Sequence, residues 1–463
     1  MRTPAPFTLP AIRSLTVTDR KSNRRDFLKT SASIAATSGV VPYLWTSSYA
    51  RAQETNDRPN LASIGLGGMG SHDGRSASRF ADVVACCDVD QQRAEKFASG
   101  FDKKPDIYGD YREVLGRQDV DVVTIGTPDH WHTKIVIDAL KAGKDVQCQK
   151  PLTLTIDEGK VICKVVKETG KILHIGTQQR SENRSMFLKA IALAQSGRLG
   201  KRLTATCSIG GGPTGGPFEN TDPPAHLDWN YWLGQTPKVP YCPQRCHGNF
   251  RWWLEYSGGK MTDWGAHHID IAQWGLGYTN SGPVEAEGTG VFPNHPADLD
   301  PVAFFKGEQK IPNGYNTATT FKITLTYENG NQMIVQHGPD NGIWFEGEKG
   351  RIFVNRGRLT GEPVEKLTEA ENEWLDREVI KLYNGKEPGD HMRHFFECLK
   401  ERSFTVSDPF THHRTMTACH LCNIALLLKR KLRWDPVKED FIGDEQASAL
   451  RSRQQRKPYT IEA

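Results

Sequence analysis

The sequence predicts an α/β protein in which a parallel sheet flanked by helices precedes an α+β domain with a large, mostly antiparallel sheet. At 463 residues the chain is long enough for two or three domains. Its first part alternates helical stretches with short apolar or β-branched runs, at residues 61–64, 83–87, 120–125, 145–148 and 172–175. Strands separated by helices are joined by right-handed crossovers and form a parallel sheet. The later part, from Thr317 to Val354, has strand-like runs around an Asn329-Gly330 hairpin turn.

A glycine-rich turn follows the first predicted strand and opens a helix. The strand Leu61–Ile64 leads directly into Gly65-Leu66-Gly67-Gly68-Met69-Gly70, and the second strand ends in Asp88, 18 residues after Gly70. This context predicts a Rossmann domain, in which Gly65, Gly67, Gly68, Met69 and Gly70 approach a pyrophosphate at the helix N-terminus. Asp88 is expected to bind the adenosine ribose hydroxyls. Because its charge would repel a 2′-phosphate, NAD is favoured over NADP.

The first fifty residues resemble an export signal rather than part of a fold. A twin-arginine element, Asn23-Arg24-Arg25-Asp26-Phe27-Leu28-Lys29, precedes the mildly apolar run Thr30–Trp45 and the A-x-A site Ala50-Arg51-Ala52. The apolar run is short and interrupted, so we expect no stable membrane anchoring. We predict export to the periplasm by the Tat machinery, with cleavage after Ala52.

The predicted domain organisation follows from these patterns. The helices expected in the first domain cover residues 91–99, 132–142 and 156–169, and those near the end of the chain cover residues 391–400 and 411–429. The strands expected in the second domain cover residues 320–327, 333–336, 343–346 and 351–354. We divide the chain into a signal peptide (1–52), a Rossmann domain (58–180), an α+β domain (181–435) and a polar tail (436–463).

Charge and cysteine usage exclude some classes of function. The net charge is only +4, and the one run of like charges, Lys429-Arg430-Lys431, ends an apolar helix, so no nucleic-acid partner is expected. The 10 cysteines form no disulfide framework or zinc pattern, and no metal is assigned. We interpret Cys419-His420-Leu421-Cys422 as core packing. Whether Cys242 and Cys246 pair is left open.

One stretch, Gly258 to Asp270, contains acidic and histidine residues at a spacing that suits proton abstraction. Read as a continuous helix, it places Asp263, His267 and Asp270 at i, i+4 and i+7 on one face. A carboxylate one turn from an imidazole can accept its N–H and raise its basicity, as a general base requires. The same spacing also occurs on ordinary solvated faces.

Two loops are expected at the C-terminal ends of the parallel strands, where ligands bind in open α/β sheets. They are Thr127–His132 and Gln149–Thr153. Lys150, fixed by the following proline, could polarise a substrate hydroxyl or could be an ordinary loop lysine. The aromatic, Gly- and Pro-rich stretch 210–250 suits either the apolar faces of sugar rings or the anchoring of loops to the core.

Together these motifs resemble the Gfo/Idh/MocA family of oxidoreductases, which includes glucose-fructose oxidoreductase and inositol dehydrogenase, and in particular its Tat-exported members. The resemblance runs from Leu61 to Asp435. It rests on the glycine turn, on Cys87-Asp88-Val89, on Thr127-Pro128-Asp129-His130-Trp131-His132, on Lys150-Pro151, and on Gly258-Gly259 leading to Asp263 and His267. It implies that His267 takes the proton from a hydroxyl whose carbon gives hydride to NAD, with Lys150 and Asp263 as the other catalytic residues.

The resemblance also implies the remaining contacts. Thr127, Pro128 and His130 would line the nicotinamide end of the cofactor. Gln149 stands where the family usually has glutamate; its amide can bind a ribose hydroxyl but cannot lower the potential around Lys150. The candidate substrate contacts are Lys150, Arg180, Trp253, Asp263, His267 and His268.

The predicted function is that of an NAD-dependent oxidoreductase acting on a CH–OH group of a sugar, polyol or glycoside. Because free NAD is not expected outside the cytoplasm, and Tat export carries folded proteins, we expect NAD to stay bound and hydride to be recycled. The alternatives are a redox-neutral glycosidase or lyase acting through a keto-sugar, and a non-catalytic periplasmic sugar-binding protein. A homo-oligomer, either a dimer or a tetramer, is expected because an open antiparallel sheet leaves a face to be covered.

Overall fold

The computed structural model describes residues 58–462. The predicted signal peptide, residues 1–52, lies outside the described residues. Within the described part of the chain, none of the helices has the length and apolar character needed to cross a membrane.

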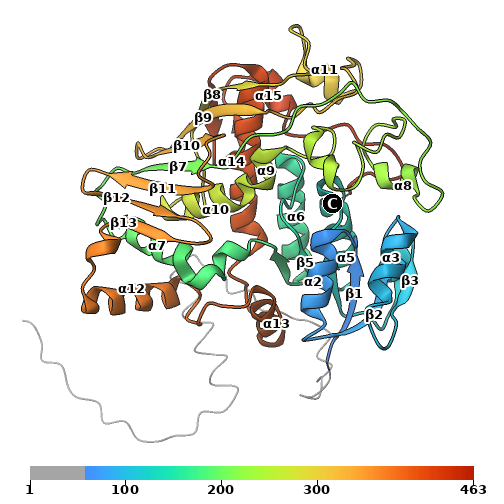
Figure 1. Ribbon diagram of the computed structural model, residues 1–463, viewed down its shortest axis with the longest axis horizontal. Helices are drawn as coiled ribbons and strands as arrows, with labels where there is room; N and C mark the ends of the chain where they lie inside the picture. The colour runs from blue at the N-terminus through green and yellow to red at the C-terminus, as the bar shows by residue number, and fades with distance from the viewer. Residues whose placement is uncertain (1–57, 463) are drawn as a thin grey trace, which may run out of the picture. The chain divides into compact units, whose positions relative to one another are not determined.

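The first sheet is parallel and has the strand order β3-β2-β1-β4-β5-β6 (Figure 1). Its strands are β1 (Asn60–Ile64), β2 (Asp82–Cys87), β3 (Asp106–Tyr108), β4 (Val122–Ile125), β5 (Asp145–Cys148) and β6 (Leu173–Ile175). This is the arrangement of a Rossmann domain, so the predicted first sheet is confirmed. Sequence reasoning missed β3, because its three residues are too few and too exposed to form an apolar run.

Helices flank this sheet, and two of them begin at aspartate caps. The flanking helices are α2 (Gly68–Ala77), α3 (Gln91–Ala98), α4 (Tyr111–Gly116), α5 (Asp129–Lys141) and α6 (Ile156–Thr169). The side chains of Asp90 and Asp110 accept backbone N–H groups at the starts of α3 and α4. Helix α5 was predicted to begin at residue 132 but begins at Asp129, after Pro128. The motif residues 129–132 therefore lie in its first turn rather than in a loop.

The second sheet has nine strands in the order β13-β12-β11-β7-β10-β9-β8-β14-β15. They are β7 (Thr204–Ser208), β8 (Glu285–Val291), β9 (Thr320–Thr326), β10 (Gln332–Gln336), β11 (Gly342–Gly347), β12 (Gly350–Val354), β13 (Leu359–Glu362), β14 (Leu432–Asp435) and β15 (Asp440–Phe441). All pairings are antiparallel except β7 with β10. The mostly antiparallel sheet is thus confirmed, with the hairpin turn at Gly330, where φ is +83°.

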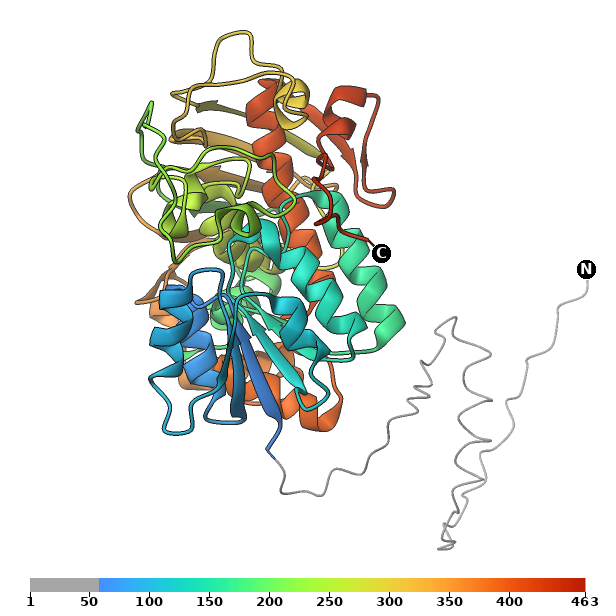
Figure 2. The same cartoon turned by 90° about the vertical axis from the view of Figure 1, so that its right-hand side faces the viewer.

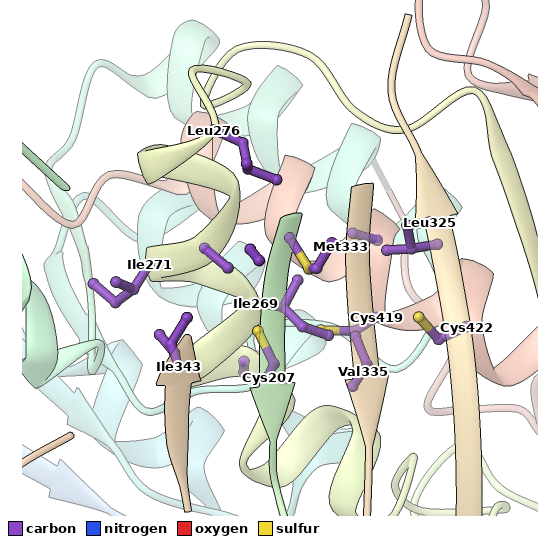
Figure 3. Close-up of a cluster of buried hydrophobic side chains, with 14 of the residues drawn as sticks. Cys207, Ile269, Ile271, Leu276, Leu325, Met333, Val335, Ile343, Cys419 and Cys422 are labelled. Atoms are coloured by element: carbon purple, nitrogen blue, oxygen red, sulfur yellow. The ribbon is translucent and has the colours of Figure 1, made fainter. Parts of the chain in front are cut away.

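Helices pack against one face of the second sheet and enclose the main core (Figure 3). The helices of this domain are α7 (Met186–Gln195), α8 (Trp229–Leu233), α9 (Lys260–Asp263), α10 (Gly265–Gly275), α11 (Pro301–Phe305), α12 (Glu369–Leu382), α13 (His391–Glu401), α14 (Pro409–Leu428) and α15 (Glu445–Ala449). Helix α14 is buried on almost every side, between β8 and β9 and helix α6 of the first domain. Cys419 and Cys422 pack in this core, as predicted.

The end of the chain differs from the polar tail predicted at 436–463. It forms β15 and α15 and then returns to the first domain, where the ring of Tyr459 lies 5.6 Å from that of Trp131. The backbone N–H of Arg456 also donates to the carbonyl of Gln235 at 2.8 Å. Figure 2 shows this C-terminal segment beside the helices of the first domain. The residues that pack here are too widely spaced to be recognised as an apolar run.

A buried ion pair links the loop after β6 to α10. The guanidinium of Arg180 donates to both carboxylate oxygens of Asp270, at 2.7 and 2.6 Å, and both side chains are almost inaccessible. Burial alone would raise the pKa of Asp270, but the Arg180 charge outweighs it and holds that pKa below its usual value. Each charge is therefore stable in the core only while the other is present.

We expect Arg180→Met to lower the free energy of unfolding by about 3–5 kcal/mol, because it leaves the Asp270 carboxylate buried without its partner. Urea denaturation measures this change. The matched control is Lys366→Ala, which removes an exposed ion pair with Glu362 and should leave the stability nearly unchanged. Equal effects of the two substitutions would contradict the structural role of Arg180.

Candidate active site

The predicted cofactor residues gather around one cavity at the C-terminal edge of the first sheet. Nine of the eleven line it: Gly65, Gly67, Gly68, Met69, Asp88, Thr127, Pro128, Gln149 and Lys150. The turn from β1 to α2 needs glycine at position 65, where φ is +78° and a Cβ would collide with the backbone of Thr127. The backbone can therefore approach a ligand closely at the start of α2, as a pyrophosphate site requires.

Asp88 is held in place at the end of β2. Its carboxylate accepts the backbone N–H of Leu66 at 2.7 Å and that of Asp90 at 2.9 Å. Burial raises the pKa of Asp88, and the two backbone donors counteract this rise. The carboxylate is thus fixed beside the glycine turn, where an acidic residue can bind ribose hydroxyls.

The other two predicted cofactor residues have different roles. Gly70 lies where a Cβ would collide with the carbonyl of Gly65, so it allows α2 to pack against the turn. His130 is almost completely buried in the first turn of α5, and its Nε2 lies 2.8 Å from the carbonyl oxygen of Trp232. Burial lowers the pKa of His130 to about 3, so the ring is neutral. The ring packs in an aromatic cluster with Trp232 and Tyr256, outside the cavity lining, and its contact with the nicotinamide end stays a prediction.

Lys150 and Asp263 form the central contact of the candidate active site. The ammonium of Lys150 donates to Oδ1 of Asp263 at 2.9 Å and to the backbone carbonyl of the same residue at 2.8 Å. Nε of Arg251 also donates to Oδ1, at 3.3 Å. Burial would raise the pKa of Asp263, but the charges of Lys150 and Arg251 prevail and lower it to about 2. The carboxylate is therefore ionised over the physiological pH range.

In the structure, which describes both residues, Asp263 and His267 do not form the predicted hydrogen bond. The stretch 258–270 is not one continuous helix, because α9 ends at Asp263 and α10 begins at Gly265. The Asp263 carboxylate bonds to Lys150 on another element instead of to His267. The third member of the expected face, Asp270, pairs with Arg180.

His267 lies close to Lys150 and is neutral. Burial lowers the pKa of His267 well below its ordinary value, and the charges of Lys150 and Arg356 lower it further. Its Nδ1 is enclosed and has no hydrogen-bond partner among the described residues. A neutral imidazole beside a lysine ammonium can accept a proton from a substrate group.

Three of the predicted substrate contacts are buried structural residues. Arg180 is paired with Asp270. The indole N–H of Trp253 donates to the carbonyl of Gln244 at 2.8 Å, and His268 Nε2 lies 2.5 Å from Asn341 Oδ1. Trp253 and His268 are 0% and 1% exposed. None of the three is among the residues that line the cavity, and their contact with substrate stays a prediction. The sequence does not reveal which polar or aromatic side chains face inward.

Sequence reasoning missed Asp129. It begins helix α5, lines the cavity, and accepts a hydrogen bond from the Ser257 hydroxyl at 2.5 Å. Burial raises the pKa of Asp129 to about 7, and the charges of Arg251 and Lys150 limit that rise. The only sequence signal is its place in the Thr127–His132 motif. This carboxyl group therefore changes charge near neutral pH, close to Lys150.

The segment 226–252, which we call the strap, forms the opposite wall of the cavity. Its residues Tyr231, Trp232, His247, Gly248, Phe250 and Arg251 face the glycine turn across that cavity. The strap is attached to the first domain by backbone hydrogen bonds from Gln91 to His226 and from Asp228 to Val89, at 2.9 and 3.0 Å. The hydroxyl of Tyr231 also donates to Asp110 at 2.6 Å.

The aromatic rings of the strap pack on one another rather than stand free. Trp229 stacks on Trp232, with ring centroids 4.7 Å apart, and both are buried. Cys242 and Cys246 lie in the same cluster as free thiols. In residues 58–462 no group of three or more His, Cys, Asp or Glu side chains is arranged to hold a metal ion. The aromatic side chains of the strap therefore anchor it, and Tyr231, Trp232 and Phe250 line the cavity as well.

We expect a pH-dependent contribution of Asp129 to stability. Its pKa is raised on folding, so its stabilisation is fully present below about pH 4 and is lost as the pH rises through about 7. The free energy of unfolding of the wild type, measured relative to that of Asp129→Asn, should therefore fall by on the order of 3 kcal/mol between pH 5 and pH 8. Urea denaturation at both values tests this, with the exposed Asp340→Asn as the control. A constant difference between wild type and Asp129→Asn would contradict the buried carboxyl.

Comparison with known proteins identifies the family. Residues 60–177 match the oxidoreductase family's NAD-binding Rossmann fold, and residues 215–461, more than half of the chain, match that family's C-terminal alpha/beta domain. The chain is 23% identical over 305 residues to the uncharacterized oxidoreductase YrbE of Bacillus subtilis, a match covering 64% of this chain and 74% of YrbE. It is 32% identical over 157 residues to inositol 2-dehydrogenase of Rhodococcus erythropolis, covering 33% of this chain and 44% of that enzyme. The inositol dehydrogenase match thus spans less than half of that relative's length.

Solved structures share the fold over 81–82% of this chain. A levoglucosan dehydrogenase in complex with NADH and levoglucosan has a TM-score of 0.54 at 16% identity, covering 81% of this chain and 99% of the other. The WlbA dehydrogenase from Bordetella pertussis, in complex with NADH and UDP-GlcNAcA, has a TM-score of 0.57 at 16% identity, covering 82% and 99%. With both domains matched in order, and the glycine turn and Asp88 placed around one cavity, the chain belongs to the Gfo/Idh/MocA family of oxidoreductases and carries its NAD-binding Rossmann fold.

Proposed function

We propose that this protein oxidises a CH–OH group of a sugar, polyol or glycoside, keeps its NAD bound, and returns the hydride within the same catalytic cycle. The observation that carries the proposal is the Lys150–Asp263 pair beside a neutral His267, next to the cavity of the glycine turn. The glycine turn and Asp88 fit NAD, which supplies the hydride acceptor when bound. The names of the solved relatives, which include dehydrogenases in complex with sugar compounds, support this class of substrate.

The side chains divide the work between them. A lysine ammonium has three N–H donors, and two of those of Lys150 are used by Asp263. The third can bind the oxygen of the reacting hydroxyl, where it stabilises the negative charge that develops as the proton leaves. The neutral His267 takes that proton. Asp263 orients Lys150 through these two hydrogen bonds.

The strap supports the retention of NAD. Because it forms one wall of the cavity and is bonded to the first domain at Val89, Gln91 and Asp110, release of a bound dinucleotide requires these contacts to open. We also propose that the twin-arginine element at residues 23–29 directs export of the folded protein to the periplasm. A retained cofactor is what an NAD-dependent enzyme needs in a compartment without free NAD.

The same retention favours a second candidate, a redox-neutral glycosidase or lyase. Oxidation of a sugar carbon to a ketone acidifies the neighbouring C–H, so that His267, once it has passed the hydroxyl proton to solvent, could remove that proton while the Lys150 ammonium protonates the departing glycosidic oxygen. In a glycosidase, water would then add to the C=C bond so formed. The hydride would then be returned to the keto group. Both candidates need the retained cofactor, and product analysis after incubation with glycosides separates them.

We further propose that a second copy of the chain covers the face of the nine-stranded sheet opposite to α10 and α14. Side chains on this face, such as Ile334 and Trp344, are only partly buried. Partly exposed apolar side chains on an open sheet face provide a suitable surface for self-association.

The bound cofactor is tested on protein purified from the periplasm. Acid denaturation should release NAD(H) in near-stoichiometric amount, detected by absorbance and mass spectrometry. Protein that is empty and binds NAD only weakly would contradict the hydride cycle while leaving membership of the family unaffected.

The role of His267 is tested by comparing hydride-transfer rates in variants of His267 and of the adjacent His268. We expect His267→Asn to lower the rate of hydride transfer by about 10²–10⁴-fold, since a general base contributes that much, while NAD stays bound. His268→Asn is the matched control, because His268 is bonded to Asn341 rather than open to the site. It should affect thermal stability more than the rate per folded molecule. Similar rate losses in both variants would count against His267 as the base.

A further inference from the structure

Gln149, where the family usually has glutamate, contacts a buried carboxylate on another element. Its Nε2 donates to Oδ2 of Asp73 at 2.7 Å, and Nε2 of Gln147 approaches the same oxygen at 3.3 Å. Asp73 lies on α2, is 4% exposed, and has no part in the proposed proton and hydride transfers. A carboxylate is therefore present near position 149, but it comes from the glycine-turn helix.

This contact fixes which end of the Gln149 amide faces the cofactor cavity. An ionised carboxylate can only accept hydrogen bonds, so the amide must present its NH2 group to Asp73. Its carbonyl oxygen, Oε1, then points away from Asp73. Oε1 has no hydrogen-bond partner within residues 58–462, and Gln149 lines the cavity. The amide is also packed against Gly176, where a Cβ would come within 2.7 Å of Nε2.

We propose that Asp73 is a positioning residue that holds Gln149 as a hydrogen-bond acceptor for a ribose hydroxyl of bound NAD. In this arrangement the acceptor comes from a neutral amide, and the negative charge that position 149 lacks is supplied from behind it by Asp73. The inference rests on NAD binding by the first domain and is independent of the proposed hydride cycle.

The arrangement depends on the charge of Asp73. Burial raises the pKa of Asp73 to about 6, while the hydrogen bond from Gln149 and the charge of His72 lower it, and the charge of Glu182 raises it. Above this pKa the carboxylate fixes the amide. Below it the protonated carboxyl can donate to Oε1, so the amide can turn its NH2 group toward the cofactor. NAD affinity should therefore fall as the pH drops from 7 to 5.

The test compares Asp73→Asn with the reciprocal double variant Asp73→Asn/Gln149→Glu, in the full chain after removal of NAD. The asparagine introduced at position 73 can donate or accept, so the single variant no longer fixes Gln149, and we expect its Kd for NADH at pH 7.5 to rise about tenfold. In the double variant the glutamate introduced at position 149 can only accept, and the new asparagine amide donates to it. The double variant should therefore recover wild-type affinity to within about threefold. NADH fluorescence titration gives Kd, and the thermal unfolding midpoint checks that each variant is folded.

Glu182→Gln is the matched control, because Glu182 also acts on Asp73 electrostatically but does not contact Gln149. It should keep the wild-type Kd at pH 7.5. Between pH 7 and pH 5 the wild type should lose affinity, whereas Asp73→Asn, which has no titrating carboxyl at position 73, should show no such loss. Unchanged affinity in Asp73→Asn, or an equal loss in the single and double variants, would overturn the proposal. If the single variant does not fold, the affinity of the double variant at pH 7.5 decides the question: recovery to within about threefold of wild type supports the proposal, and a tenfold loss overturns it.

Discussion

The ion pair between Lys150 and Asp263 is the interaction on which the candidate active site depends. It joins the loop after β5, in the first domain, to the end of α9 in the second, and both side chains are largely buried. Two charges removed from water are stable only if their mutual geometry is good and further hydrogen bonds are made. The backbone carbonyl of Asp263 and the guanidinium of Arg251 supply those bonds. The site therefore exists only when the two domains are docked.

The rest of the structure maintains that docking. Helix α14 packs against both the large sheet and α6, and Arg180 pairs with Asp270 across the same interface. On the cofactor side the strap closes the cavity from the second domain, so the proposed NAD site has walls from both domains. The proposed cofactor site and the position of Lys150 are thus both consequences of one interface.

Much of the fold could be predicted because its signals are local. The apolar runs, the glycine turn and the Asn329-Gly330 hairpin each act within a few residues, and the structure has strands and turns where they indicated. The failures share one cause, which is that distant contacts override local patterns. The stretch 258–270 was expected to be one helix, whereas the structure has two, α9 ending at Asp263 and α10 beginning at Gly265. Likewise, nothing local distinguishes Arg180, buried beside an aspartate, from an arginine open to substrate.

By itself the sequence determined the chemistry that is present: a glycine turn after a strand, an acidic residue at the end of the next strand, a lysine before proline, and an aspartate and a histidine after two glycines. The tertiary structure alone decided the partners. Lys150 bonds to Asp263, 113 residues away, and Gln149 bonds to Asp73, 76 residues away. Periodicity restricts only residues within one helix or strand, whereas burial and partner choice depend on how distant segments pack, and these set the charge and direction of each functional group.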